Sequence, residues 1–175
     1  MLRWLLAALV TVFAGLLAVS LVFYVAPVAV PSQVPSVDFI LVEKHAHQMQ
    51  MYSQGVFVRS YDIALGRGGS GAKAKSGDNK VPEGLYRIIG RNPLSAFHLS
   101  LRIGYPTAQQ QKDAERAGVD PGGDVMIHGL RNGLGWLGSW HRMLDWTRGC
   151  IAVTDDEIEQ IWKTVPNGTL IEIRP

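Results

Sequence analysis

A long uncharged segment at the start of the chain sets the first constraint on its fold. No residue from Trp4 to Val37 is charged, and the part from Trp4 to Ala26 is almost wholly apolar. About 20 apolar residues cross a hydrocarbon core of ~30 Å as a helix, whereas a cleaved signal peptide has an apolar region of roughly 7–15 residues. We therefore predict an N-terminal transmembrane helix, or a signal segment, in residues 1–26 and a proline-rich spacer in residues 27–36. Residues 37–175 then suffice for a single domain of ordinary size.

The charges of the chain limit its orientation and its partners. Arg3 precedes the apolar segment and no basic cluster closely follows it. The positive-inside rule therefore places the amino terminus in the cytoplasm and residues 37–175 outside it. The formal net charge is only +2 at pH 7, which argues against the dense basic face that nucleic acid binding requires. We expect a membrane-anchored domain with no nucleic acid partner.

Residues 37–175 are predicted to be mainly β. Alternating or continuous apolar runs of strand length recur along them, separated by turn signals such as Gln54-Gly55. These patterns predict strands within residues 37–44, 48–53, 56–65, 84–90, 96–105, 123–130, 151–153 and 167–175. The segment from 66 to 82 is rich in Gly, Lys and Ser and predicts a long surface loop whose lysines are solvated.

Three segments carry helix signals. Residues 107–118 contain strong helix formers and end at a glycine that suits a C-cap. Thr154 and Glu157 have the spacing of a capping box, which predicts a helix that begins there. The expected buried stripe of this helix comprises Ile158, Ile161, Trp162 and Val165. Residues 136–146 have the apolar spacing of an amphipathic helix that would cover a cleft. The expected fold is therefore strand-dominated, with one or two flanking helices.

The single cysteine, Cys150, follows Gly149 in a turn that leads into a short apolar run. Such a turn presents a side chain together with consecutive backbone N–H groups. A lone cysteine can equally be a small buried apolar residue, and a nucleophilic thiol needs a base because its ordinary pKa is near 8.5. His128, at the end of an apolar strand, is the best candidate base. The alternative is a core histidine that is hydrogen-bonded to a neighbouring carbonyl.

Several separated segments resemble the L,D-transpeptidase catalytic domain (YkuD-like) family. Ile-His-Gly at 127–129, a short gap and Thr-Arg-Gly-Cys at 147–150 are similar to the family signature of His-Gly, a variable gap, Ser or Thr, His and Gly-Cys. Upstream, GDNKVPEGLYRI resembles the family's Pro-x-Gly-x-Tyr/Phe strand entry. The segments NPLSAFHLSLRIGYP and GGDVMIHG resemble a subgroup of small membrane-anchored members. The resemblance covers residues 37–174.

The resemblance implies a β-sandwich-like sheet with a helix on its flank, and an enzyme of the peptidoglycan cell wall that needs no cofactor. Cys150 is then the nucleophile and His128 the general base and later acid, and the carbonyl of Gly129 orients the histidine. Amide groups of the turn, that of Gly149 among them, would bind the oxyanion of the tetrahedral intermediate. The resemblance also implies a single-pass protein of the bacterial inner membrane whose catalytic domain lies on the periplasmic side.

Two residues depart from the family signature. Arg148 stands where the family has histidine before Gly-Cys, and Ala152 stands where it has arginine. We predict that Arg148 binds a substrate carboxylate or supports the turn, because a guanidinium offers two parallel donors to carboxylate oxygens. The alternative is a surface ion pair with Asp145 or Asp155. Thr147 occupies the family's Ser/Thr position and is expected to hydrogen-bond near the thiol, or else to be a plain turn hydroxyl.

The remaining histidines give weaker signals. His98 could contact substrate from its strand or face the solvent. His45 and His47 lie two apart, on one face of a strand, and could be imagined as zinc ligands together with other histidines and the cysteine. Their spacing contains no CxxC or HExxH pattern, so we expect no metal and no cofactor.

The sequence leaves three functions open. The first is acyl transfer: a stem peptide of peptidoglycan forms an acyl-enzyme on Cys150, and an amine of a second stem or of a wall-linked protein accepts it. The second is hydrolysis through the same first half-reaction, as in an L,D-carboxypeptidase or an amidase that releases wall-linked protein. The third is a membrane-anchored module that binds the wall and whose cysteine is structural or idle.

Overall fold

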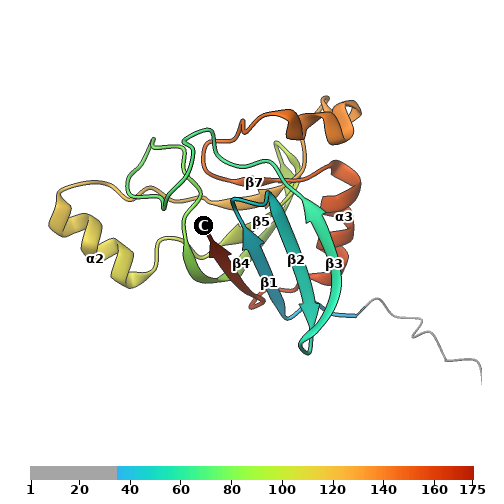
Figure 1. Cartoon of the computed structure of the whole chain (residues 1–175), viewed down its shortest axis with the longest axis horizontal. Coiled ribbons are helices and arrows are strands. Elements are labelled where there is room, and N and C mark those ends of the chain that lie inside the picture. The colour runs from blue at the N-terminus through green and yellow to red at the C-terminus, as the bar shows by residue number, and fades with distance from the viewer. Residues whose placement is uncertain (1–34) are drawn as a thin grey trace, which may run out of the picture. The chain divides into compact units, whose positions relative to one another are not determined.

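The computed structural model describes residues 35–175, which build one eight-stranded sheet (Figure 1). In chain order the strands are β1 Phe39–Glu43, β2 Gln48–Ser53, β3 Val56–Asp62, β4 Gly84–Ser95, β5 His98–Ile103, β6 Met126–His128, β7 Ile151–Ala152 and β8 Leu170–Arg174. They lie in the order β3-β2-β1-β8-β4-β5-β6-β7. The β1–β8 and β6–β7 pairs are parallel. The mainly β prediction is confirmed, and the expected sandwich takes the form of one curled sheet.

Alternating side chains give the sheet a buried apolar face. In β1, Ile40 and Val42 are buried while their neighbours are partly exposed. β2 repeats the pattern with Met49 and Met51. Since successive side chains of a strand point to opposite faces, these four residues enter the core together. The alternation predicted for residues 37–44 and 48–53 is confirmed.

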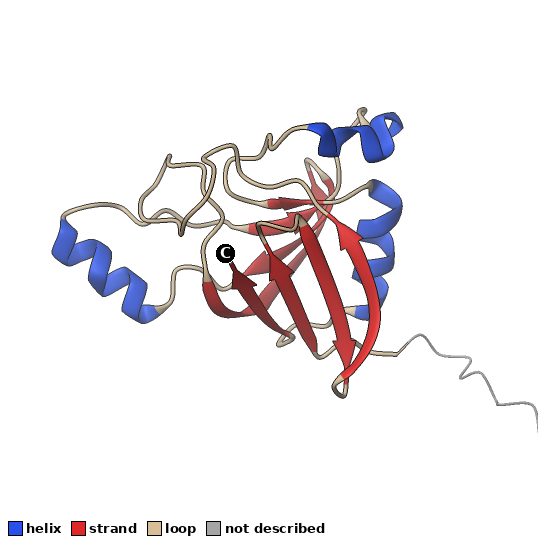
Figure 2. Ribbon diagram, in the orientation of Figure 1, coloured by secondary structure: helices blue, strands red, loops and turns tan. Residues whose placement is uncertain are grey.

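The curled sheet closes where its two edge strands approach each other (Figure 2). Just after β3, Ala64 exchanges both backbone hydrogen bonds with Ala152 of β7, each at 2.9 Å between nitrogen and oxygen. The two alanines are 1% and 0% exposed, so their small side chains let two backbones meet inside the core. Gly66 forms a second bridge with Thr147. The chain that leaves β3 is therefore bound to the segment that leads into β7.

Helix α3, Asp155–Thr164, begins three residues after the end of β7 and flanks the sheet (Figure 2). The hydroxyl of Thr154 accepts from the amide of Glu157, and the Glu157 carboxylate accepts from the amide of Thr154. Ile158 and Ile161 are fully buried in the core, and Val165 follows them at the C-cap. The predicted capping box is confirmed, and so is the buried stripe except at Trp162, which is only partly buried.

Helix α2, Ala108–Ala117, lies away from α3 and projects from the sheet (Figure 1). It has its own capping box between Thr107 and Gln110, and it ends at Gly118, whose φ of 65° is the left-handed conformation of a C-cap. Ala114 is its buried residue. The helix predicted for residues 107–118 is confirmed, and its stability depends more on its caps than on packing.

The amphipathic helix predicted for residues 136–146 is wrong. The segment forms two 3₁₀ turns within Gly135–Met143, separated by Gly138 with φ 48° and ψ −133°. Its large apolar side chains point outward: Trp136 is 78% exposed and Trp140 is 72% exposed. Because glycine adopts a conformation there that other residues rarely adopt, the helix cannot continue and the apolar stripe is never aligned.

Strand β4 is longer than the predicted strand at residues 84–90. It continues to Ser95 with register shifts between Ile88 and Gly90 and between Asn92 and Ser95. Asn92 and Pro93 signal a turn in the sequence, but proline is tolerated in a strand at an edge or a bulge. The extension carries the β4–β5 hairpin out to its turn at Ala96 and Phe97.

The predicted transmembrane helix in residues 1–26 lies outside the described residues, as does most of the spacer in residues 27–36. Within residues 35–175, no helix combines the length and the apolar character needed to cross a membrane.

The two capping boxes should differ in their effect on stability. We expect Thr154→Ala to lower the free energy of unfolding by about 1 kcal/mol, because it removes the cap of a helix that is packed in the core. Thr107→Ala, the matched control in α2, should cost less because that helix can fray without opening the core. Urea unfolding of both variants measures the difference. An equal or larger loss for Thr107→Ala would contradict this account.

Candidate active site

A cleft of about 810 Å³ lies between the β4–β5 hairpin, the start of β7 and the 3₁₀ segment. It gathers four of the residues that the sequence singled out: His128, Thr147, Arg148 and Cys150. Cys150 directly precedes β7, and His128 ends the neighbouring parallel strand β6. The register pairs His128 with Ala152, so the thiol and the imidazole start from positions two residues apart along the ladder.

The ring of His128 is held in one tautomer. Its Nδ1 lies 2.7 Å from the carbonyl oxygen of Gly129, and a carbonyl can only accept, so Nδ1 carries the proton. Nε2 is then the unprotonated, basic nitrogen. Burial lowers the pKa of His128 below its ordinary value, and the bond to Gly129 opposes this only in part. The resting imidazole is therefore neutral and able to accept a proton.

Two aromatic side chains fix the plane of this imidazole. The ring centroid of Phe97, at the tip of the β4–β5 hairpin, lies 4.5 Å from that of His128. The ring centroid of Trp146 lies 5.7 Å away, with an angle of 66° between the two ring planes. Both residues line the cleft. They restrict the rotation of the ring and keep water from its faces.

Cys150 is partly buried at the floor of the cleft. Its sulfur contacts the carbonyl oxygen of Asp124 at 3.7 Å, which is a hydrogen bond that only the protonated thiol can donate. Burial raises the pKa of the thiol, while the backbone of Met126 and the charge of Lys73 lower it. The resting sulfur is therefore a neutral thiol that needs a base to become a nucleophile.

Thr147 is the hydroxyl that shapes the turn before the cysteine. It is 3% exposed, donates to the carbonyl of Cys150 at 2.7 Å and accepts from the amide of Gly149 at 3.2 Å. Both ends of the turn are thus tied to one side chain. The predicted hydrogen bond near the thiol is present, through the backbone rather than the sulfur.

The loop after β3 packs directly against this turn. A side chain at Gly149 would place its first carbon 2.7 Å from the carbonyl oxygen of Lys80, and Gly149 has a φ of 112°. A side chain at Gly66 would meet the carbonyl oxygen of Asn79 at 2.1 Å. The amide of Arg67 donates to the carbonyl of Thr147 at 3.0 Å. Glycine is required at both close approaches, and the loop supports the turn that precedes Cys150.

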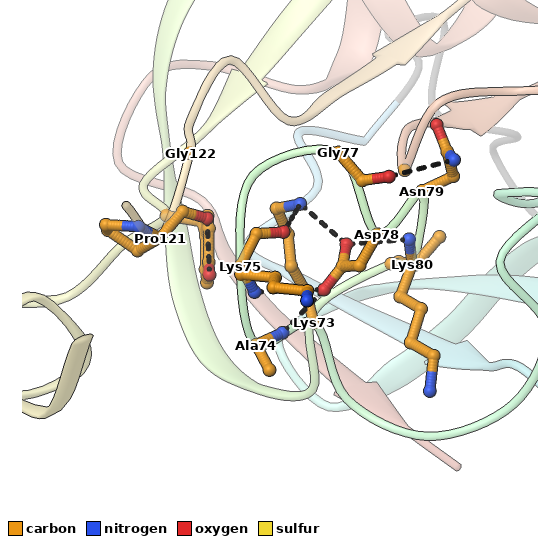
Figure 3. A network of polar contacts seen from close by, with 12 residues as sticks. Lys73, Ala74, Lys75, Gly77, Asp78, Asn79, Lys80, Pro121 and Gly122 are labelled. Atoms are coloured by element: carbon orange, nitrogen blue, oxygen red, sulfur yellow. Dashed lines mark hydrogen bonds and ion pairs between the residues drawn. The ribbon is translucent and has the colours of Figure 1, made fainter. Parts of the chain in front are cut away.

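A buried ion pair organises that loop (Figure 3). The ammonium of Lys73 lies 2.8 Å from the carboxylate of Asp78, and their side chains are only 5% and 10% exposed. The same carboxylate accepts hydrogen bonds from the amides of Ala74, Lys75 and Lys80. These donors hold the pKa of Asp78 well below its usual range. Solvated lysines were expected in this loop, and for Lys73 that expectation is wrong.

A second lysine holds the loop from the sheet. Lys44, just after β1, is 6% exposed. Its ammonium donates to the carbonyl of Gly71 at 2.7 Å, to that of Val81 at 3.3 Å and to the carboxylate of Glu83 at 2.7 Å. A segment that is rich in glycine therefore has a defined shape because charged groups replace an apolar core within it.

Arg148 and His98 differ in position. Arg148 is exposed and lines the cleft. Neither alternative partner binds it: Asp145 binds His47 and the amide of Leu65, and Asp155 accepts from the amide of Leu130. The Nε2 atom of His98 instead lies 3.0 Å from Glu159 on α3, and His98 is not among the cleft residues. The structure thus brings together Cys150, His128, Thr147 and Arg148, but not His98.

One cleft residue has no signal in the sequence. His141 is 8% exposed, its Nδ1 lies 3.4 Å from the indole nitrogen of Trp146, and its Nε2 has no partner among residues 35–175. Burial and the charge of Arg142 lower its pKa to about 4, so it is neutral near pH 7. It lies in the segment wrongly predicted as an amphipathic helix, where it would have occupied the polar face.

His45 and His47 lie outside the cleft. His45 lies 2.9 Å from the carbonyl oxygen of Pro175, and His47 lies 3.0 Å from a carboxylate oxygen of Asp145. Within residues 35–175, no three His, Cys, Asp or Glu side chains are grouped so that they could hold a metal ion.

Comparison with known proteins assigns this domain to a family. The model of the L,D-transpeptidase catalytic domain (YkuD) matches residues 37–173. YafK of Escherichia coli (strain K12) is 30% identical over 144 residues, which cover 78% of this chain and 50% of that protein. The chain belongs to the L,D-transpeptidase catalytic domain family. It spans about half the length of the curated relatives that it matches.

Solved structures share the fold at lower identity. The helical cell shape determining protein Pgp2 from Campylobacter jejuni superposes with a TM-score of 0.59 at 22% identity, over 80% of this chain and 48% of Pgp2. Bd1075 of Bdellovibrio bacteriovorus gives a TM-score of 0.57 at 21% identity, over 79% of this chain and 48% of Bd1075. These likenesses establish the fold of residues 35–175.

Removal of Asp78 should destabilise the domain in a pH-dependent way. We expect Asp78→Ala to lower the free energy of unfolding by about 3 kcal/mol, because it leaves a buried ammonium unpaired. A carboxylate whose folded pKa is depressed contributes stability above its unfolded pKa of about 3.9, and the contribution is lost as the pH falls through the folded pKa. The difference in free energy of unfolding between the native protein and Asp78→Ala should therefore be constant above about pH 5. It should become smaller in more acid solution.

Urea unfolding between pH 2 and pH 7 measures this gap. Asp113→Ala is the matched control, because Asp113 pairs with Arg116 on the exposed face of α2 and should change stability by less than about 0.5 kcal/mol. A gap for Asp78→Ala that stays the same down to pH 2 would show that the charge of this carboxylate does not stabilise the loop.

Proposed function

We propose that the domain cleaves a stem peptide of peptidoglycan by acyl transfer through a thioester on Cys150. One observation carries this proposal: His128, whose Nδ1 is bonded to the carbonyl of Gly129 at the end of β6, shares a cleft with Cys150, which directly precedes the neighbouring parallel strand β7. Membership of the L,D-transpeptidase catalytic domain family supports the reaction class. The acceptor can be an amine of a second stem or of a wall-linked protein, as in transpeptidation, or water, as in hydrolysis.

The proposed steps use each group in the state that its surroundings favour. Nε2 of His128 takes the thiol proton as the sulfur attacks the amide carbon, so that a C–S bond forms and the carbonyl oxygen becomes anionic. The C–N bond then breaks, and the imidazolium gives its proton to the leaving amine. An acceptor amine or water attacks the thioester and passes a proton to His128, which returns it to the departing sulfur.

The turn before the cysteine supplies candidate donors for the oxyanion. The amide of Gly149, the donor expected from the sequence, points to Thr147 at 3.2 Å and would have to leave this bond. The amide of Cys150 itself needs no such exchange with Thr147 and is the better candidate. Thr147 holds the carbonyl of Cys150, and the loop after β3 holds the carbonyl of Thr147. Because the turn is fixed in this way, its amide could bind the oxyanion with little reorganisation of the backbone.

We also propose that Arg148 binds a carboxylate of the stem peptide and that residues 1–26 anchor the domain to the bacterial inner membrane, with the domain on the periplasmic side. Exposure of Arg148 at the cleft supports the first of these proposals. The uncharged segment from Trp4 to Val37 supports the second.

The central experiment follows the mass of the protein. Incubation with a defined stem tetrapeptide should add the mass of the acyl group to the native protein and not to Cys150→Ala, in which turnover should be abolished. His128→Ala should lower the rate by about 10²- to 10⁴-fold. His98→Ala is the matched histidine control and should retain activity because His98 lies outside the cleft.

The same incubation separates the three functions. A cross-linked product indicates transpeptidation, a shortened peptide indicates hydrolysis, and a released protein tail indicates an amidase. Failure of both the peptide and a thiol alkylator to label Cys150 at neutral pH would leave a wall-binding module as the remaining function.

The pH dependence of turnover should report the buried imidazole. Catalysis needs neutral His128, and burial lowers the pKa of this group. The acid limb of kcat/KM should therefore have its midpoint below 6.5, the ordinary value for histidine. Phe97→Ala should move this midpoint upward by admitting water to the ring. A native midpoint above pH 7 would contradict the assignment of His128 as the base.

A further inference from the structure

The cleft is lined by two arginines whose side chains have no hydrogen-bond or ion-pair partner among residues 35–175. Residues 35–175 contain ten arginines, and the side chains of seven donate hydrogen bonds or form ion pairs within the domain. The remaining three, among the residues described, are Arg67, Arg131 and Arg148. Arg131 and Arg148 both line the cleft, and Arg67 does not.

The other ionisable groups of the cleft do not balance these two charges. Asp124 is the acidic residue in the lining, and it is already paired with Arg102. The pKa values of His128 and His141 are lowered and that of Cys150 is raised, so all three groups are neutral near pH 7. The cleft therefore presents two uncompensated positive charges, which attract and orient an anionic substrate.

The strand topology places the two arginines at opposite ends of the catalytic pair. Arg131 lies three residues beyond the C-terminal end of β6, and Arg148 lies three residues before the N-terminal end of β7. Because β6 and β7 are parallel, the exit of one and the entry of the other are at opposite ends of the ladder. Arg148 is therefore on the side of the thiol and Arg131 on the side of the imidazole.

We propose that Arg131 and Arg148 bind one carboxylate on each side of the scissile amide, so that the cleft selects a peptide whose acyl residue and leaving residue are both anionic. This inference rests on the proposed function. His128 protonates the leaving amine, so the leaving residue lies on its side, and Arg131 binds the α-carboxylate of that residue. Arg148, next to the nucleophile, binds a free side-chain carboxylate of the acyl residue. Guanidinium groups suit this task because they offer two parallel donors to a carboxylate.

The test crosses protein variants with amidated peptides. Four tetrapeptides are used: one with both carboxylates free, one amidated on the acyl residue, one amidated on the leaving residue and one amidated on both. Binding is measured in the Cys150→Ala background by calorimetry, so that the result does not depend on turnover. Arg131→Gln and Arg148→Gln are compared with Arg67→Gln, which makes the same change of charge outside the cleft.

Each arginine variant should lose affinity only for peptides that keep its own carboxylate. We expect Arg131→Gln to weaken binding of the free peptide by about 10- to 100-fold and to leave binding of the peptide amidated on the leaving residue within about threefold. Arg148→Gln should show the reverse preference, and Arg67→Gln should bind all four peptides like its parent. Equal losses on every peptide, or no loss in Arg131→Gln, would overturn the proposal.

Failure of the arginine proposal and failure of the proposed function give different results. If the native protein forms the thioester but Arg131→Gln binds all peptides normally, the assignment of Arg131 is wrong and the chemistry stands. If the affinity pattern holds but no acyl-enzyme forms, the cleft binds dianionic peptide ends without the proposed reaction. Absence of binding of any of the four peptides to the parent protein would overturn the carboxylate assignment.

Discussion

The backbone pairing of Ala64 with Ala152 is the contact on which the site depends. It joins the two edges of a curled sheet, each alanine exchanging two hydrogen bonds with the other in the core. Without it β7 would be held by β6 alone, through a ladder of two residues. Because Cys150 directly precedes β7, the position of the sulfur is set by this closure. The long-range pairing of backbones thus determines where the only thiol of the chain lies.

Next to the turn that precedes Cys150, polar interactions stabilise the chain where apolar packing does so elsewhere. The loop after β3 has almost no apolar side chains to bury, yet it holds its shape because Lys73 pairs with Asp78, and Lys44 pairs with Glu83 and donates to loop carbonyls. A buried ion pair is costly unless every group has partners, and here the Asp78 carboxylate has four. The result is a firm polar support close to a cleft whose own sulfur and imidazole stay neutral.

Local sequence patterns predicted most elements of this fold, but they did not predict the contacts between residues that are far apart in the sequence. Period-2 alternation identified β1 and β2, and the box of Thr154 and Glu157 identified α3, because each signal lies within a few residues. The motif residues His128, Thr147, Arg148 and Cys150 line one cleft, although His128 is far from the other three in the sequence. No local pattern encodes the pairing of Ala64 with a residue 88 positions away, since it depends on how the whole sheet curls. At residues 136–146 a local pattern was misleading. The apolar residues have the spacing of a helix, but the conformation of Gly138 interrupts the helix.

Closure of the sheet accounts for both departures from the family signature, Ala152 and Arg148. Ala152 is fully buried, pairs with His128 on one side and bonds to Ala64 on the other. An arginine at this position would carry its charge into the closed part of the sheet, where desolvation is expensive. At Arg148 the same charge lies on the exposed rim of the cleft and costs little. Closure of the sheet through a small residue therefore favours a cation before Cys150 over one after it, and it leaves the charge of Arg148 exposed at the cleft.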